Sequence, residues 1–391
     1  MFKEIHEMRH QELKRERNAL EEIVPRMRAS VERGADWLVG QFSPHGPIMK
    51  LRDLSYCHKP TWGLYEAGRI GEARTLLDWI SQNARMGTGR YGFPEEPPFN
   101  NEMQLLYRFL TFGVVAEKIG HPSFTDAGTR DEVLTYQDPS GGVFPNKDDP
   151  RYMSAQNPLL ASFFVEWAMA AGLRDAAALS SDFLVKIVDL NLQHMEREPG
   201  RFYFNYDPEK RDLSTRPEPG GKINCYVDTV GEKQQFYHIG TAMAALANFY
   251  ILDGGSKYLE SATRLGDFER RLNPAGPLWP SYCKIGWGAA ALYRATGFPA
   301  HREMAAKVSE STFMGSQTPA GGWTDMYYPI RDHGAWESVK YDGPGQVHGD
   351  IPRDGSWERL SGQEITGEFL AEMGFTLRVF EEALDTIDGL V

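Results

Sequence analysis

The chain has few cysteines, no long run of apolar residues and fewer basic than acidic side chains. Its three cysteines are Cys57, Cys225 and Cys283. So sparse and odd a count does not make a disulfide framework and is typical of a reducing compartment. No apolar run approaches the ~18 residues that a membrane span needs. The charged segment Met1–Leu20 also lacks the apolar stretch of a secretory signal. We therefore expect a cytoplasmic protein without membrane contacts.

The charge balance also limits the classes of partner. The formal net charge is -12, whereas nucleic acids and anionic membrane surfaces attract basic proteins. No glycine-rich phosphate loop or dinucleotide-binding fingerprint is present, so no nucleotide cofactor is expected. The sequence thus predicts a small-molecule substrate, with no cofactor and no nucleic-acid partner. It leaves open whether identical subunits assemble.

The remaining composition is that of a globular protein rich in aromatic residues. Hydrophobic residues make up 41% of the 391 residues and aromatic residues 12%, without a Pro/Ser linker or a break in composition. We expect one domain over residues 1–391, with 1–22 as a candidate N-terminal helical extension.

Hydrophobic periodicity predicts about twelve helices, arranged as one helix, five pairs and one helix. The expected ranges are 3–42, broken near Pro25; 58–68 with 72–86; 101–120 with 123–136; 154–172 with 174–195; 232–252 with 256–272; 281–296 with 299–314; and 362–384. The first helix of each pair is apolar on all sides and should be buried, whereas the second is amphipathic. The pattern predicts an all-α fold, an (α/α)6 toroid with six inner and six outer helices. An open α-solenoid is the alternative.

A glycine-aromatic turn precedes several of these helices. Its clearest copies are Gln137–Phe144 and Gln317–Trp323, and weaker ones lie at 89–94, 200–207 and 276–280. A motif that returns every roughly 50 residues indicates a repeat architecture.

The two clear copies resemble the glutamine-glycine-aromatic repeats of the terpenoid cyclase and protein prenyltransferase superfamily, whose members are α/α toroids. The plan is also similar to that of the linalool dehydratase-isomerase enzymes, (α/α)6 barrels that use acid-base residues and no metal. This resemblance implies acid-base chemistry on an apolar substrate. The chain departs from the family motifs, because Asn146 stands where a class II cyclase has its first aspartate and no Asp-Asp-x-x-Asp run is present. The zinc-ligand order of the prenyltransferases is missing too.

Parallel inner helices would all begin at one mouth of the ring. Helix N-termini there focus positive potential, which lowers the pKa of a thiol. The sequence places six candidate catalytic residues at this mouth: Cys57, His58, Asp148, Asp149, His238 and Cys283.

Each candidate has a chemical and a structural interpretation. Asp148 and Asp149 could form a general acid with its electrostatic partner, because crowded carboxylates split their pKa values. They could equally be a solvated turn. His58 is the natural base for Cys57, or both cap a helix, and His238 is either functional or a satisfied core residue. Cysteine and histidine suit zinc, but the spacing of a zinc site is missing, so no metal is expected.

Aromatic and polar residues of the same loops are the candidate substrate-binding groups. They are Phe144, Gln156, Tyr206, Tyr237, Trp279, Tyr282, Trp287, Trp323 and Asp325. Aromatic walls stabilise a developing cation, stack on sugar rings, or pack the loops.

These observations favour a lyase or isomerase that uses acid-base chemistry on a small, largely apolar substrate such as an isoprenoid. The alternative is a carbohydrate-active enzyme, a glycoside hydrolase, polysaccharide lyase or sugar epimerase, by analogy of fold and because paired carboxylates hydrolyse glycosides. A second alternative is a toroid that binds a ligand without catalysis. An open polar groove in place of an apolar pocket would contradict the first interpretation.

Overall fold

The computed structural model describes residues 2–390 apart from 44, 50–51, 88–89, 97–104, 148–155, 216–224, 325–326, 330–340, 344–345, 348–356 and 360–361. No helix in this part of the chain is long and apolar enough to cross a membrane.

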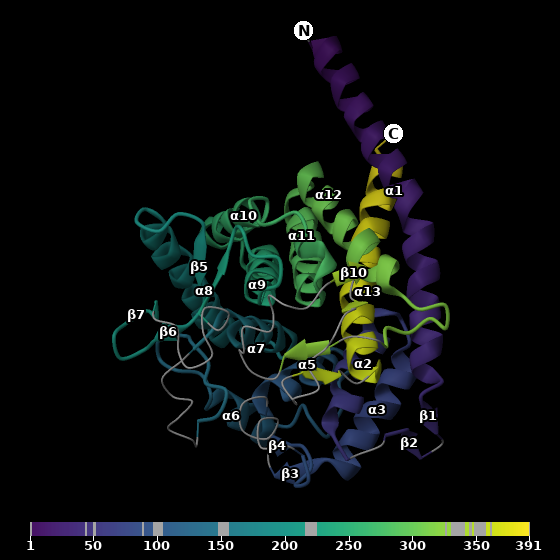
Figure 1. Cartoon of the computed structure of the whole chain (residues 1–391), viewed down its shortest axis with the longest axis vertical. Helices are drawn as coiled ribbons and strands as arrows, with labels where there is room; N and C mark the ends of the chain where they lie inside the picture. Colours follow the sequence, from purple (N-terminus) through teal and green to yellow (C-terminus); the bar gives the residue numbers. More distant parts are fainter. Residues whose placement is uncertain are drawn as a thin grey trace.

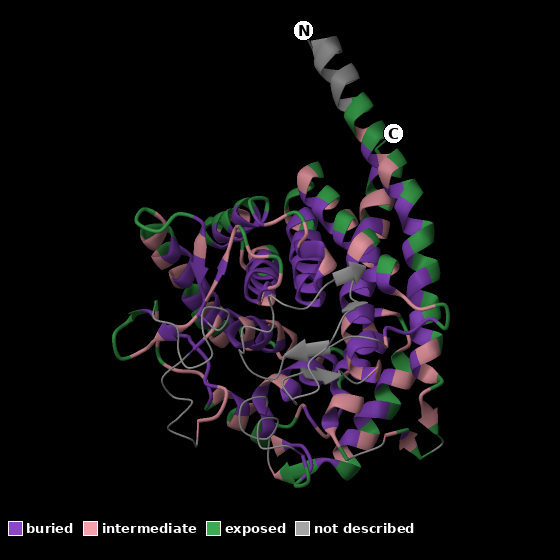
Figure 2. Ribbon diagram, in the orientation of Figure 1, coloured by how far each residue is buried: buried purple, intermediate pink, exposed green. Residues whose placement is uncertain are grey.

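In the described part of the chain, six inner helices pack side by side into a closed ring; Figure 1 labels them. They are α2 (His58–Glu66), α5 (Leu105–Ile119), α7 (Pro158–Ala170), α9 (Tyr237–Asp253), α11 (Cys283–Thr296) and α13 (Gly362–Asp388). Each packs against the next in this order, and α13 packs against α2 to complete the circle. Most of their residues are buried (Figure 2), as expected for helices that are apolar on all sides.

Six outer helices among the described residues surround this ring. They are α1 (Phe2–Val39), α3 (Ile70–Asn83), α6 (Ala127–Leu134), α8 (Arg174–Met195), α10 (Ser256–Glu269) and α12 (Pro299–Val308). Helices α3, α8, α10 and α12 each pack on the inner helix that precedes them, and α1 packs on α13. The pairing of the first and last helices closes the ring and confirms the predicted all-α (α/α)6 toroid over an open solenoid.

The strands of the described residues are short and pair only in twos, all antiparallel. The pairs are β1 (Phe42–Ser43) with β2 (Gly46–Pro47), β3 (Arg85–Gly87) with β4 (Arg90–Tyr91), β5 (Arg201–Tyr203) with β8 (Tyr226–Asp228), β6 (Tyr206–Asp207) with β7 (Asp212–Leu213), β9 (Tyr327–Pro329) with β12 (Trp357–Arg359), and β10 (Tyr341–Gly343) with β11 (Gln346–Val347).

Most of the predicted helix boundaries differ from the observed ones by a few residues. One expectation is wrong, because α1 continues through Pro25 without a break. Pro25 lies on the exposed face of α1. Water can therefore solvate the carbonyl group that loses its hydrogen bond at the proline.

The two clear copies of the glycine-aromatic turn clamp the ring to its outer helices. The Gln317 amide donates to the carbonyl oxygens of Ser30 and Gly321 at 2.9 and 2.7 Å, and the Ser30 hydroxyl donates to Gln317 at 2.7 Å. Gln137 makes the equivalent contacts with Ala176 and Ser180 of α8, both at 2.8 Å. The repeated glutamine therefore fixes each turn to an outer helix, which explains the motif as a structural one.

Candidate functional site

Polar side chains from the first turns of the inner helices meet near the axis of the ring. They are Lys59 of α2, Tyr107 of α5, Tyr237 of α9, Lys284 of α11, and Glu364 of α13 with Glu368 one turn further on. Lys59 Nζ lies 5.8 Å from the centre of the Tyr107 ring, and Tyr107, Glu368 and Lys59 all act on the pKa of Tyr237. The N-termini of the inner helices converge at one mouth of the ring, as predicted, and their polar side chains lie close together there.

Two lysines and three glutamates form a row of alternating charges at this mouth. Lys59 Nζ lies 2.9 Å from Glu364 Oε1 and 2.7 Å from Glu368 Oε2. Lys284 donates to both Glu368 and Glu372. The row thus runs Glu364–Lys59–Glu368–Lys284–Glu372 and links three inner helices, α2, α11 and α13.

The two deeper glutamates respond differently to this environment. Burial raises the pKa of Glu368, but Lys284 and Lys59 outweigh it and lower the pKa to about 2. For Glu372, burial dominates over the attraction of Lys284 and raises the pKa to about 7. Glu368 therefore stays ionised at neutral pH, whereas Glu372 gains and loses a proton near neutrality.

His58 lies behind Glu364 as a neutral base. Its Nδ1 is 3.0 Å from the carbonyl oxygen of Leu54, so Nδ1 carries the hydrogen and Nε2 keeps its lone pair. Nε2 is buried, accepts no hydrogen bond from the described residues, and lies 4.0 Å from Glu364 Oε1. Burial, Lys59 and Arg108 together lower the pKa of His58 well below its usual value.

Two phenols complete the mouth. Burial raises the pKa of Tyr107 to about 12, and it also raises the pKa of Tyr237. Both hydroxyl groups therefore keep their protons at neutral pH and can donate hydrogen bonds. Both side chains are partly exposed, as are Glu364 and Glu368. The surface offered to a ligand is thus polar and charged.

An aromatic layer closes the ring beneath the charged row. The rings of Trp62, Phe163 and Trp287 lie 5.4 to 5.7 Å apart, and Lys284 Nζ sits 5.4 Å above Trp62. On the other side of this layer is a pocket with an empty volume of about 340 Å³, which includes open solvent. Its polar lining comes from the far ends of the inner helices: Glu66, Lys118, Glu166 and Asn248. The aromatic layer therefore lies between this pocket and the charged row.

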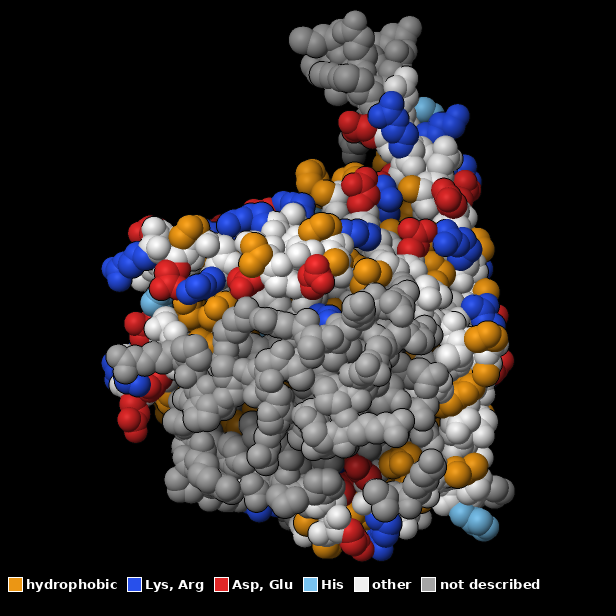
Figure 3. All heavy atoms as spheres, viewed as in Figure 1, with side chains coloured by type: hydrophobic (Ala, Val, Ile, Leu, Met, Phe, Trp, Pro, Cys, Tyr) orange, Lys and Arg blue, Asp and Glu red, His pale blue; other side chains and the backbone are white. Residues whose placement is uncertain are grey.

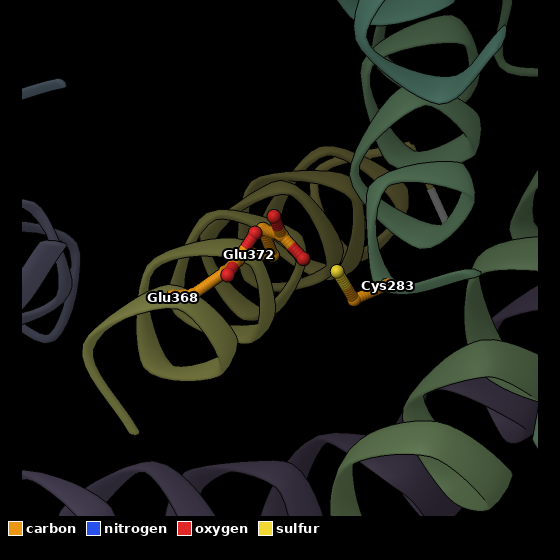
Figure 4. Close-up of side chains that lie close together, drawn as sticks. All are labelled: Cys283, Glu368 and Glu372. Carbon is orange, nitrogen blue, oxygen red and sulfur yellow. The ribbon is translucent and has the colours of Figure 1, made fainter. Parts of the chain in front are cut away.

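The cysteines do not match the expectation of activated thiols. Burial raises the pKa of Cys57 and of Cys283 well above the usual value, and the Glu372 carboxylate beside Cys283 raises the pKa of that thiol further. Cys283 Sγ does lie with Glu368 and Glu372 in a group whose ligand atoms are within 4.8 Å of one another (Figure 4). The Lys284 ammonium group bonds both glutamates and so takes the place that a metal cation would fill.

Three predicted binding residues point away from the mouth. The Tyr282 hydroxyl bonds Glu269 of α10, and the Tyr206 hydroxyl bonds Lys186 of α8, both outer helices. Trp323 is fully buried and donates from Nε1 to the carbonyl oxygen of Phe313 at 2.9 Å. All three were expected at the mouth because of their position in the sequence. Their hydroxyl or indole groups instead find partners in the outer layer, as buried polar groups must.

The remaining described candidates are enclosed in the loops or in the core. Gln156 pairs with the Tyr206 backbone and packs against Gly142. His238 stacks on Phe204 with ring centres 3.9 Å apart, and burial lowers the pKa of His238 to about 3. Trp279 and Phe144 are buried, and Trp287 belongs to the aromatic layer. Asp148, Asp149 and Asp325 lie outside the described residues.

Sequence reasoning overlooked the groups that carry most of the charge at the mouth. Lys59, Lys284, Glu368 and Glu372 were not among the candidate site residues of the sequence analysis. A usable signal was present, because each of them is an ionisable residue among apolar neighbours in the first turns of an inner helix. Such residues are rarely buried unless they are paired.

Several solved structures similar to this chain bear the names of carbohydrate enzymes. A D-mannose isomerase is similar with a TM-score of 0.57 and 12% identity, over 92% of this chain and 97% of the isomerase. A possible member of the GH105 family from Salmonella enterica has a TM-score of 0.56 and 10% identity, over 91% and 94%. An α-1,6-mannanase from Salegentibacter, in complex with α-1,6-mannotriose, has a TM-score of 0.52 and 11% identity, over 90% and 99%. The sequence itself matches no protein-family model and no curated protein.

These likenesses confirm the α/α toroid and contradict the terpenoid interpretation. The expected lyase or isomerase on an apolar isoprenoid substrate is wrong, because the similar structures are glycoside hydrolases and a sugar isomerase. The charged row at the mouth also argues against an apolar substrate, since burying it against hydrocarbon would leave its polar groups without water. The glutamine-glycine turns misled because they are structural clamps found at the ring's periphery.

Proposed function

We propose that this protein is a carbohydrate-active enzyme that isomerises or epimerises a sugar by proton transfer beside its carbonyl group. The fold likeness to a D-mannose isomerase supports this choice. The observation that carries it is the row at the mouth, where Lys59 holds the partly exposed carboxylates of Glu364 and Glu368. Such a site offers two carboxylates that can act as bases and one ammonium group that can stabilise a negative charge.

The protonation states favour proton abstraction over glycoside hydrolysis. Hydrolysis needs a protonated carboxyl group next to the leaving oxygen. The low pKa of Glu368, about 2, rules it out as that acid near neutral pH, and Glu372 is completely enclosed. Among the described residues, the mouth therefore supplies the ionised carboxylate of Glu368 and two neutral phenols, which suit the formation of an enediol.

In the proposed reaction Glu364 takes the proton from C2 of an open-chain aldose. The electron pair left on C2 forms the C1–C2 double bond, and the C1 oxygen takes up the negative charge. Tyr107 and Tyr237 donate hydrogen bonds to this oxygen, and Lys59 adds a positive charge. Return of the proton to C1, with movement of the O2 proton to O1, gives the ketose. Return to the other face of C2 gives the epimer.

His58 would make this proton transfer easier. Its neutral Nε2 lies 4.0 Å from Glu364 Oε1 and has a free lone pair. The imidazole can therefore share the proton while the enediol exists, provided that the two groups approach by about 1 Å on substrate binding, as catalytic hydrogen bonds often do.

The test is solvent exchange of the hydrogen on the carbon beside the carbonyl group. We expect the protein, incubated in D₂O, to replace the C2 hydrogen of D-mannose or D-glucose, or one C1 hydrogen of D-fructose, with deuterium, as followed by ¹H NMR. Glu364→Gln should lower the exchange rate by about 10²-fold or more, because the general base is lost. Glu381→Gln is the matched control, since Glu381 lies near the other end of α13 in a surface pair with Arg28. Absence of exchange with aldoses and ketoses of this kind would overturn the proposal.

A second candidate is the hydrolysis of an α-linked mannan. Asp148 and Asp149 are adjacent aspartates, and the mannanase with this fold was solved as an inactive variant in which two adjacent aspartates are changed to asparagine. Release of reducing ends from α-1,6-mannan that is lost in Asp148→Asn and Asp149→Asn, and kept in Glu364→Gln, would favour this hydrolase.

A further inference from the structure

The backbone of Leu54 connects His58 to a buried ion pair. Leu54 belongs to the 3-10 turn η1 (Leu54–Tyr56) just before α2. Its carbonyl oxygen accepts the hydrogen bond from His58 Nδ1 at 3.0 Å, and its N–H donates to Glu96 Oε1 at 2.5 Å. The two peptide groups that flank the Leu54 Cα thus join the histidine to Glu96, which lies 42 residues from Leu54 in the sequence.

Glu96 is held in turn by Arg108 of α5. Arg108 donates to Glu96 Oε2 at 2.6 Å, and the two side chains are 1% and 0% exposed. Asp53 lies further off, with Oδ1 4.0 Å from the guanidinium group. Two charges so deeply enclosed lose their hydration, and a buried ion pair is a weak source of stability in itself. Its contact with the Leu54 backbone that orients His58 suggests a functional reason for the pair.

We infer that Glu96 and Arg108 are positioning residues of the candidate site. By holding the Leu54 backbone in place through its N–H, they keep its carbonyl oxygen aimed at His58 Nδ1, and so keep His58 in the tautomer with hydrogen on Nδ1 and with the Nε2 lone pair directed toward Glu364. The inference rests on the proposed function only for the role of His58 in catalysis. The geometry of the Leu54 backbone stands without it.

The surroundings of His58 make the tautomer sensitive to this arrangement. Besides Leu54, the groups that face or act on the imidazole are Asp53, Lys59, Tyr107, Arg108 and Glu364. Of the hydrogen bonds described for the ring, only the one to Leu54 distinguishes its two nitrogens. If the Leu54 carbonyl turned away, the imidazole could carry its hydrogen on Nε2 and donate it to the Glu364 carboxylate. Nε2 would then have no lone pair with which to accept a proton from Glu364.

The experiment is ¹⁵N NMR of the full chain labelled in its histidines. The His58 signals are identified by their absence in His58→Gln. We expect wild type at neutral pH to show hydrogen on Nδ1 and a bare Nε2. Glu96→Ala should move His58 to the other tautomer or to a mixture, and lower kcat roughly tenfold with KM changed less than twofold, as expected for a lost orienting partner. Glu96→Gln keeps an acceptor oxygen for the Leu54 N–H and should restore the wild-type tautomer.

The control is Glu66→Gln. Glu66 is also an enclosed carboxylate in an ion pair, with Arg378, but at the opposite end of α2. It should leave the His58 spectrum unchanged. Wild type with hydrogen on Nε2, or folded Glu96→Ala with the wild-type tautomer, would overturn the inference. A changed tautomer with unchanged kcat would support the positioning role and overturn the part that the proposed function gives to His58. If Glu96→Ala fails to fold, Glu96→Asp, whose shorter side chain cannot reach the Leu54 N–H in the same way, takes its place in the same comparison.

Discussion

Lys284 is almost completely enclosed, with 1% of its side chain exposed, and its ammonium group forms ion pairs with Glu368 and Glu372. Removing one partner of a buried ion pair leaves the other charge without compensation, which typically costs about 3–5 kcal/mol. We therefore expect Lys284→Met to lower the free energy of unfolding by that amount in urea titrations followed by circular dichroism. Arg28→Met is the comparison, because Arg28 pairs with Glu381 at the surface. It should cost below about 1 kcal/mol, and equal costs for the two variants would contradict the explanation.

Glu372 makes the free energy of unfolding depend on pH. Burial raises its pKa to about 7 in the folded state, whereas an unfolded glutamate titrates near about 4.3. The folded state thus binds more protons between these values, so this group makes the protein less stable as the pH rises from about 4.3 to 7. Glu368 acts in the opposite direction, because its lowered pKa of about 2 gives stability above pH 4.3 that is lost on acidification.

Glu372→Gln isolates the first of these effects. The variant cannot ionise at this position, so its stability relative to wild type should improve between pH 5 and pH 8. Thermal unfolding of both proteins at the two pH values measures the difference. A relative stability that does not change with pH would show that Glu372 ionises normally in the folded protein.

At the scale of elements, the inner helices approach so closely that glycine is required where they cross. A Cβ atom on Gly367 of α13 would lie 2.3 Å from the backbone nitrogen of Pro60 in α2. Gly367→Ala should therefore separate the helices that carry Glu364 and Lys59, and lower both stability and activity, by at least about 1–3 kcal/mol in unfolding. Gly71→Ala in α3 meets no atom within 4 Å. It should be neutral or stabilise by about 0.5–1 kcal/mol.

The helices themselves could be predicted because the spacing of apolar residues along the sequence shows which face of each helix is buried. Helix α8 was expected at Arg174–Met195 and is found there, since charges on one face and apolar residues on the other leave little choice. The contents of the mouth could not be predicted in the same way. Lys59 and Glu368 are 309 residues apart, and nothing local says that a lysine on α2 will meet a glutamate on α13. Tyr282 and Tyr206 were misplaced for this reason, because a loop residue can turn to either layer.

For the whole molecule, closure of the ring predicts how the protein unfolds. Each inner helix contacts two inner neighbours, and α13 contacts both α1 and α2. No repeat can therefore detach without exposing apolar surface on two sides. We expect one cooperative transition, with tryptophan fluorescence and far-ultraviolet circular dichroism coinciding. Two separated transitions would indicate the independent repeats of a solenoid.

Cutting the ring open tests the same idea. A chain that ends before α13, at residue 361, loses the helix that joins the two ends and that carries all three glutamates of the row. It should lack a cooperative transition. Removal of a surface ion pair from the outer layer, such as Arg264→Ala, which frees Asp189, should leave the transition single. Acidic and basic side chains of this kind are interspersed over the described part of the face in Figure 3.

The glutamine clamps hold the turns against the outer layer, while the first residues of the inner helices face the axis. Scaffold and candidate site are thus encoded largely by separate positions, with the enclosed Lys59 and Lys284 contributing to both. A combinatorial library restricted to 107, 237 and 364 would sample new active sites while the clamps and crossings of the ring stay constant. Laboratory evolution of this chain could therefore change the catalysed reaction through residues at the mouth, while the residues that determine the folding of the barrel are left unchanged.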